Sequence, residues 1–179
     1  FVTVALARTG LQFEAYENVH FDNLAAVEAT IHDTVWEVGT PTAAHEEHTA
    51  DLWYSNDQAF VDEIAGFAAM DNYVMRWRGQ IPIAQRGDYI FKTSSDDGSM
   101  IYIDGKAVVS NDGLHGPVTK QGKVPLTAGT HAITIVFFEN GGGSVLQVSW
   151  SPKPNAKLQP LDPKSLSNTV GCGYKTKPP

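Results

Sequence analysis

Cysteine is almost absent from this sequence, since Cys172 is the single example in 179 residues. One thiol forms no internal disulfide and no cysteine-based zinc cluster, so the fold has to be stabilised by its hydrophobic core. The chain also lacks an apolar run approaching the roughly 20 residues that span a bilayer. It has no Asn-x-Ser/Thr acceptor for glycosylation either. These absences exclude a disulfide-stapled scaffold and a protein that inserts helices into a membrane.

Positive charge is also scarce. There are 13 Lys and Arg residues against 20 Asp and Glu, which gives a formal net charge of −7 and a pI of about 5.2. The basic residues form no stripe, and an acidic chain is repelled by a phosphate backbone, so nucleic acid is excluded as a partner. An acidic surface suits a calcium-rich, extracellular setting, although many intracellular enzymes are equally acidic.

Length and composition predict one globular domain. The chain is 42% hydrophobic and 18% charged, which is typical of soluble globular proteins. Its length suits one well-buried core rather than two. We therefore expect a single domain over residues 1–179, with the core at about 10–152 and an extended, proline-rich tail at 153–179.

The second half has the pattern of short antiparallel strands. Residues 87–94 alternate, with Tyr89, Phe91 and Thr93 on one face. Asp104–Gly105 suits a type I′ turn between two β-rich runs. A longer strand then follows a turn at Ala128–Gly129, with apolar side chains on one face at Ile133, Ile135 and Phe137. Strands separated by turn signals predict an all-β antiparallel sandwich.

The first half is less regular. "ALA" near the start resembles a signal-peptide cleavage pattern, but the alternation there favours a first strand with Val2, Val4 and Leu6 on one face. Residues 55–73 predict a short helix capped by Ser55 or Asn56. "HEEH" at 45–48 is not the His-Glu-x-x-His zinc pattern and has no third ligand nearby.

Between residues 77 and 150 the sequence contains, in order, an aromatic-Gly strand, "GDYIF", "SDDG", "IDG", "LTAGTH" and a last strand ending in Trp150. These motifs resemble those of the PA-fourteen domain family. Residues 10–18 and 158–166 resemble the family's opening and closing segments. The resemblance implies a β-sandwich. Trp77 and Trp150 occupy strand positions, which assigns them to the core rather than to a sugar platform. The family is functionally mixed: it includes calcium-dependent lectins of flocculins and adhesins, accessory modules of glycosidases or toxins, and scaffolds.

Two adjacent carboxylates, Asp96 and Asp97, interrupt one of the predicted strands. Neighbouring negative charges repel each other unless a cation lies between them. In the lectin branch of the family such a pair is joined by a cis peptide and binds one Ca²⁺. The resemblance therefore implies that Asp96 and Asp97 hold a calcium ion.

The resemblance also implies that the loop after the long strand completes the calcium shell. Asn140 offers a side-chain oxygen there. Glycines can turn their carbonyls toward an ion in conformations that other residues avoid, and the loop continues with Gly141, Gly142 and Gly143. Calcium binds six to eight oxygens, so positions remain for the vicinal diol of a hexose.

Sugar binding is accordingly assigned to four residues, Asp96, Asp97, Asn140 and His115. The loop carries glycines where flocculin-type lectins often have a bulky side chain, so an aromatic platform has to come from elsewhere. The candidates are Trp36, Trp53 and His115.

Several alternatives stay open or are disfavoured. Asp-Asp-Gly also occurs as a plain turn, and Asp104 and Asp112 are assigned to turns. A glycosidase needs two carboxyl groups about 5–10 Å apart across the scissile bond, which an adjacent calcium-bound pair does not provide.

We therefore expect a non-enzymatic, calcium-dependent lectin module, part of a larger secreted or cell-surface protein that binds mono- or oligosaccharides. The alternative is a structural or accessory domain, for protein interaction or attached to a glycosidase or toxin, with no sugar site of its own.

Overall fold

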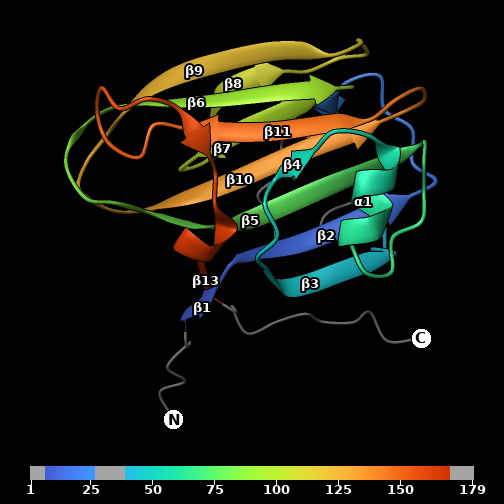
Figure 1. The fold of residues 1–179 in the computed structure, drawn as a ribbon, viewed down its shortest axis with the longest axis horizontal. Coiled ribbons are helices and arrows are strands. Elements are labelled where there is room, and N and C mark those ends of the chain that lie inside the picture. The colour runs from blue at the N-terminus through green and yellow to red at the C-terminus, as the bar shows by residue number, and fades with distance from the viewer. Residues whose placement is uncertain (1–6, 27–38, 170–179) are drawn as a thin grey trace.

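The computed structural model describes residues 7–26 and 39–169, and within these ranges the chain forms two stacked antiparallel sheets (Figure 1). The larger sheet contains β1 (Ala7–Thr9), β2 (Leu11–Glu17), β3 (Ala43–His48), β5 (Tyr73–Ile83), β7 (Ser99–Ile103), β8 (Lys106–Asn111), β10 (Gly129–Glu139) and β13 (Ser167–Thr169). The smaller sheet contains β4 (Trp53–Tyr54), β6 (Gly87–Asp96), β9 (Val118–Leu126), β11 (Val145–Trp150) and β12 (Gln159–Pro160). The predicted all-β sandwich is confirmed.

Local turn signals correctly predict the β7–β8 hairpin. Asp104 and Gly105 have φ angles of 49° and 75°, as a type I′ turn requires at both central positions. The Asp104 carboxylate also accepts a hydrogen bond from the Ala132 backbone N–H at 2.9 Å, so its turn role is confirmed. No helix in the described ranges is long and apolar enough to cross a membrane.

The predicted short helix is α1 (Asp57–Glu63), and its cap is Asn56. The Asn56 side chain accepts a hydrogen bond from the Ala59 N–H at 3.0 Å, which satisfies one of the free donors of the first turn. Phe60 stacks on Tyr54 and Phe137 with ring centroids 4.2 and 5.3 Å apart. The helix is therefore attached to the main core between the two sheets, where Trp77 and Trp150 are also buried.

A second buried cluster covers the outer face of the larger sheet and was not predicted. The expected core face of β10 is confirmed, but Val136 and Phe138 on its opposite face are also fully buried. The segment that covers them includes Phe21 and Leu24. Beside this cluster, buried Arg76 pairs with buried Glu14, with Arg76 Nε 2.9 Å from the carboxylate.

The C-terminal boundary of the core was predicted too early. Leu161 and Leu166 are 0% and 3% exposed and belong to the main core, so residues 153–169 are part of the sandwich rather than an extended tail. They contribute β12 to the smaller sheet and β13 to the larger one. The predicted strand at Val2, Val4 and Leu6, like Cys172, lies outside the described residues.

Three sheet-to-sheet connections meet at one end of the sandwich. They are Asp97–Gly98 between β6 and β7, residues 112–117 between β8 and β9, and residues 140–144 between β10 and β11. Strand register brings them together, because Ser99 lies opposite both Phe137 and Asn111, while Asp96 lies opposite Val145. The acidic pair and the glycine loop are therefore neighbours in space.

Candidate functional site

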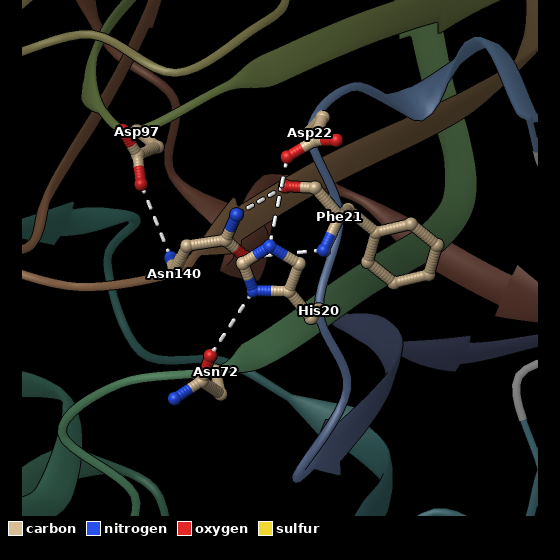
Figure 2. Close-up of polar contacts among 6 residues, drawn as sticks. All are labelled: His20, Phe21, Asp22, Asn72, Asp97 and Asn140. Atoms are coloured by element: carbon tan, nitrogen blue, oxygen red, sulfur yellow. Dashed lines mark hydrogen bonds and ion pairs between the residues drawn. The ribbon is translucent and has the colours of Figure 1, made fainter.

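The Asp96–Asp97 pair lies at this junction, and its peptide bond is cis, as the resemblance implied. The Asp97 carboxylate joins the other two connections. Oδ1 accepts from the His115 N–H at 2.9 Å, and Oδ2 accepts from the Asn140 N–H at 3.1 Å, the bond drawn in Figure 2. Gly98 allows close packing behind the pair, because a Cβ at this position would lie 2.3 Å from the Phe138 ring. Asp97 is 6% exposed and is held in place from both sides.

A third carboxylate, Glu139, completes this arrangement and was missed by the sequence analysis. Its two oxygens accept from the Asp97 N–H at 2.9 Å and the Gly141 N–H at 2.7 Å. Burial, and secondly the charge of Asp97, raise the pKa of Glu139 to about 8. Burial and then Asp97 also raise the pKa of Asp96. The only signal in the sequence was one acidic residue ending the apolar run "ITIVFF".

Within the described part of the chain, none of the ion pairs involves Asp96, Asp97 or Glu139. The His115 imidazole offsets the raised pKa of Asp96 only in part, after the larger effects of burial and Asp97. The same ranges contain no group of three or more His, Cys, Asp or Glu side chains arranged to hold a metal ion. The side chains therefore supply an excess of negative charge but only part of a calcium shell. The rest would have to come from backbone carbonyls, water or a ligand.

In the glycine loop, the side chain of Asn140 is not wholly free for a calcium ion as expected, because it is bonded to another segment. Asn140 Oδ1 accepts from the Phe21 N–H at 3.1 Å and its Nδ2 donates to the Phe21 carbonyl oxygen (Figure 2). The carboxamide thus fastens the covering segment, which leaves one lone pair of Oδ1 for any other partner. Gly142 has a φ of +113°, a conformation that favours glycine, and its N–H donates to Asp71 at 3.2 Å.

Asp57, at the start of α1, anchors the far end of the loop. Its Oδ1 accepts from both the N–H and the hydroxyl of buried Ser144. Removing this acceptor leaves two buried donors unpaired. We expect Asp57→Ala to lower the free energy of unfolding by about 1–3 kcal/mol, as measured by urea denaturation. Asp62→Ala, at the other end of the same helix, is the control, and an equal loss in both variants would contradict this role.

The segment between β2 and η1 (Leu24–Ala26) borders the site and was also not foreseen. Besides the Asn140 contacts of Phe21, the Leu24 N–H donates to Asp112 Oδ1 at 2.8 Å. The same oxygen accepts from the Gly113 N–H at 2.9 Å within its own turn, as assigned. His20 lies 3.3 Å from Asn72 Oδ1 and 3.5 Å from Asp22 (Figure 2). Nothing in the local sequence relates these residues to positions more than fifty residues away.

The junction has a buried polar base. The hydroxyls of Ser95 and Ser99 are 2.8 Å apart, and Ser99 donates to Thr93 at 3.0 Å. Asn111 donates to Ser95 and to the Val118 carbonyl at 2.8 and 2.9 Å. These bonds link the ends of two of the three connections, those between β6 and β7 and between β8 and β9, which favours a rigid rather than a fluctuating base.

The three platform candidates have different outcomes. His115 lies at the site, but its ring nitrogens lie 2.9 Å from the Gly116 carbonyl oxygen and 3.2 Å from that of Asn111, so the ring folds back onto its own loop. Trp53 is 45% exposed but belongs to β4, two strands away from Asp96. Trp36 lies outside the described residues.

The architecture defines the chain as a small antiparallel β-sandwich with an acidic junction at one end. Comparison with known families identifies the family of this sandwich: the family model of the PA14 domain matches residues 8–162. The chain belongs to the PA14 domain family, the one that its motifs resembled.

Solved structures with the same fold include sugar-binding domains. A PA14 sugar-binding domain from an RTX adhesin is 21% identical, with a TM-score of 0.73 over 89% of this chain and 98% of that one. The PA14 domain of the MpAFP antifreeze protein is 23% identical, with a TM-score of 0.72 over 97% and 98%. The A domain of epithelial adhesin 6 from Candida glabrata, solved with Galβ1-3GlcNAc, is 17% identical, with a TM-score of 0.65 over 93% and 89%. No curated protein matches the chain.

Proposed function

We propose that this domain is a calcium-dependent carbohydrate-binding module that acts in adhesion or glycan recognition outside the cell. The observation that carries the proposal is the Asp96–Asp97 pair at the meeting point of three sheet connections, where it is in no ion pair among the described residues. Membership of the PA14 family and the likeness to sugar-binding adhesin domains support it.

The donor set fits a hard cation that prefers oxygen ligands. Asp96 and Asp97 would hold Ca²⁺ through their carboxylates, while Asn140, Gly141, Gly142 and Gly143 would contribute through loop oxygens. Two of these residues are already fixed, since Asp97 accepts two backbone hydrogen bonds and Asn140 is bonded to Phe21. Glu139 is a positioning residue: it accepts from the Asp97 and Gly141 amides and so sets the distance between the pair and the loop.

Bound calcium would supply open coordination positions for two neighbouring hydroxyls of a hexose. The residues of this chain would then add hydrogen bonds, with the carboxylate oxygens of Asp96 and Asp97 accepting from the same hydroxyls. Both acids would stay ionised in such a complex, which leaves neither as a general acid. The proposed activity is therefore binding without catalysis, at the cell surface or in a secreted protein.

Two observations favour the alternative of a structural or accessory domain without a sugar site. The Asn140 side chain is engaged by Phe21, and no three-residue metal cluster occurs in the described part of the chain. On this alternative the acidic pair only builds the turn between β6 and β7.

Calcium titration monitored by thermal melting separates the two functions. At 100 times its Kd, a ligand that binds only the native state adds about 2.7 kcal/mol, which raises the Tm of a domain of this size by about 5–10 °C. We expect this increase with Ca²⁺ and not with an equal concentration of Mg²⁺, which demands a tighter octahedral shell. A glycan array with calcium or with chelator completes the test. An unchanged Tm together with chelator-insensitive binding would overturn the proposal.

A further inference from the structure

A concave site lies along the edge of the smaller sheet, away from the acidic pair. It is a cavity of about 630 Å³, and its lining includes Trp53, Pro160, Asp51, Asp62 and Glu63. Cavities of 300–1,000 Å³ are typical of small-molecule sites. The sheet topology creates this one, because β4 and β12 pair with successive parts of the same edge of β11 and α1 flanks their junction.

Trp53 is the apolar surface of this cavity. In β4 the side chains alternate, so Tyr54 is 2% exposed and packs on Phe60, whereas Trp53 is 45% exposed. Trp53 lies opposite Gln147 and Pro160 lies opposite Ser149, two residues further along β11. Successive odd positions of a strand share one face, so the indole and the proline ring are neighbours there. An indole face next to a proline ring suits the flat C–H face of a pyranose.

The polar part of the cavity is negatively charged. Asp51, Asp62 and Glu63 line it, and none of them is in an ion pair within residues 7–26 and 39–169. Asp62 accepts only from the neutral Gln58 amide, at 2.7 Å. Glu63 and Asp51 also act on the phenol of Tyr54, whose pKa is raised mainly by burial and secondly by these two charges. An indole and carboxylates around one space are complementary to an organic cation.

We infer that this cavity is a second glycan subsite that binds an amino sugar, a pyranose carrying a free ammonium group. Its ring would lie on Trp53 and Pro160, and its ammonium would lie among Asp51, Asp62 and Glu63. The volume and the apolar wall favour a sugar ring over the slender side chain of a lysine. This inference rests on the proposed function for its ligand class, but it does not depend on calcium.

The two sites lie close enough for one oligosaccharide. Asp96 is opposite Val145 and Trp53 is opposite Gln147 on the other edge of the same strand. Two strand spacings and two residues correspond to about 12 Å between the Cα atoms of Asp96 and Trp53. A chain of several sugar units therefore spans the distance, and the cavity would add selectivity for partly deacetylated glycans.

The test is isothermal titration of the whole domain with a glucosamine tetramer and with its fully N-acetylated counterpart, both in excess EGTA. We expect the glucosamine tetramer to bind at least about tenfold more tightly, since acetylation removes the charge. Trp53→Ala should weaken its binding at least about tenfold, and Asp62→Asn by about three- to tenfold. Met70→Ala removes an equally exposed apolar side chain outside the cavity (43% exposed) and should leave the affinity unchanged.

Several results would overturn the inference. Equal affinity for the acetylated tetramer would show that the carboxylates do not select the ammonium. Unchanged binding by Trp53→Ala, with its fold verified by circular dichroism, would place the ligand elsewhere. Tighter binding of tetralysine would assign the cavity to a protein partner. The proposed function fails separately: Asp96→Asn should retain glucosamine binding in EGTA whether or not the calcium site exists.

Discussion

Replacing Asp96 with asparagine is expected to abolish calcium-dependent glycan binding while leaving the calcium-free domain at least as stable as the wild type. The side chain of Asp96 accepts no hydrogen bond from the described residues, whereas Asp97 accepts two. Substitution at 96 therefore removes one charge without leaving an unpaired donor. It also relieves the repulsion between neighbouring carboxylates.

The expected loss of calcium affinity is large. Even residues that only support metal ligands typically change affinity by about 10–100-fold, so loss of a direct carboxylate ligand should reach at least about 100-fold. The measurement is the calcium-induced increase in Tm together with glycan binding. Both should vanish in Asp96→Asn, while the Tm in EGTA stays constant or rises.

Two comparisons make this result specific. Asp88→Asn removes a charge at the other end of β6, where Asp88 pairs with Lys123 at 3.0 Å, and it should keep full calcium binding. Asp97→Asn should lose calcium binding as well, but at an additional loss of about 1–3 kcal/mol in stability. An amide can accept from only one of the two backbone N–H groups that Asp97 binds. A variant at Asp96 that still melts at a higher temperature with calcium would contradict the proposed site.

Much of the second half of the fold could be predicted because its signals are local. The Asp104–Gly105 turn depends on the conformations of two residues, and the buried face of β6 follows from alternation at Tyr89, Phe91 and Thr93. The strand β3 and the short β4 were not predicted. The sequence of β3 is rich in charged residues and histidines, and β4 is only two residues long, so neither shows a strand pattern. They become strands because they pair with β2 and β11, respectively, in the folded protein.

The site could be predicted only where a motif coincides with it. The Asp-Asp-Gly turn is recognisable, but its contact with residues 140–144 depends on the register of β7 against β10. Glu139 and Phe21 are related to Asp97 and Asn140 only through folding. Asn140 is a residue type that suits a calcium ligand. In the fold, however, its carboxamide binds the backbone of Phe21, and no local sequence pattern predicts that Phe21 lies beside it.

His48 is expected to make the domain less stable on mild acidification. Glu139 opposes this contribution, because its pKa is raised to about 8 in the folded state, so the effect of His48 is isolated by comparison with a variant that lacks it. His48 is 6% exposed and packs against Phe13 and Trp77, with ring centroids 5.3 and 6.1 Å apart. Burial, and secondly the neighbouring His45, lower the pKa of His48 from 6.5 to about 4. The folded state therefore keeps this imidazole neutral, with Nε2 3.3 Å from the Tyr54 hydroxyl.

The direction of the effect follows from proton linkage. Below pH 6.5 the unfolded chain binds a proton at this histidine and the folded chain does not, so the free energy of unfolding falls as the pH is lowered. This contribution is fully present above pH 6.5 and is lost as the pH falls toward about 4, where the folded state also protonates. Each pH unit corresponds to about 1.4 kcal/mol, which gives roughly 3 kcal/mol in total.

The measurement is urea denaturation between pH 4 and 7 in EGTA, so that calcium binding does not contribute. His48→Gln retains a partner for the Tyr54 hydroxyl and does not titrate, so its stability should depend less on pH by roughly 3 kcal/mol over this interval. Lost ring packing against Phe13 lowers its stability by a similar amount at every pH, and therefore cancels in the slope. His45→Gln, on the same strand, removes only the second of the two causes and should change the slope much less than His48→Gln. Parallel pH profiles for wild type and His48→Gln would show that His48 is not the group that resists protonation in the fold.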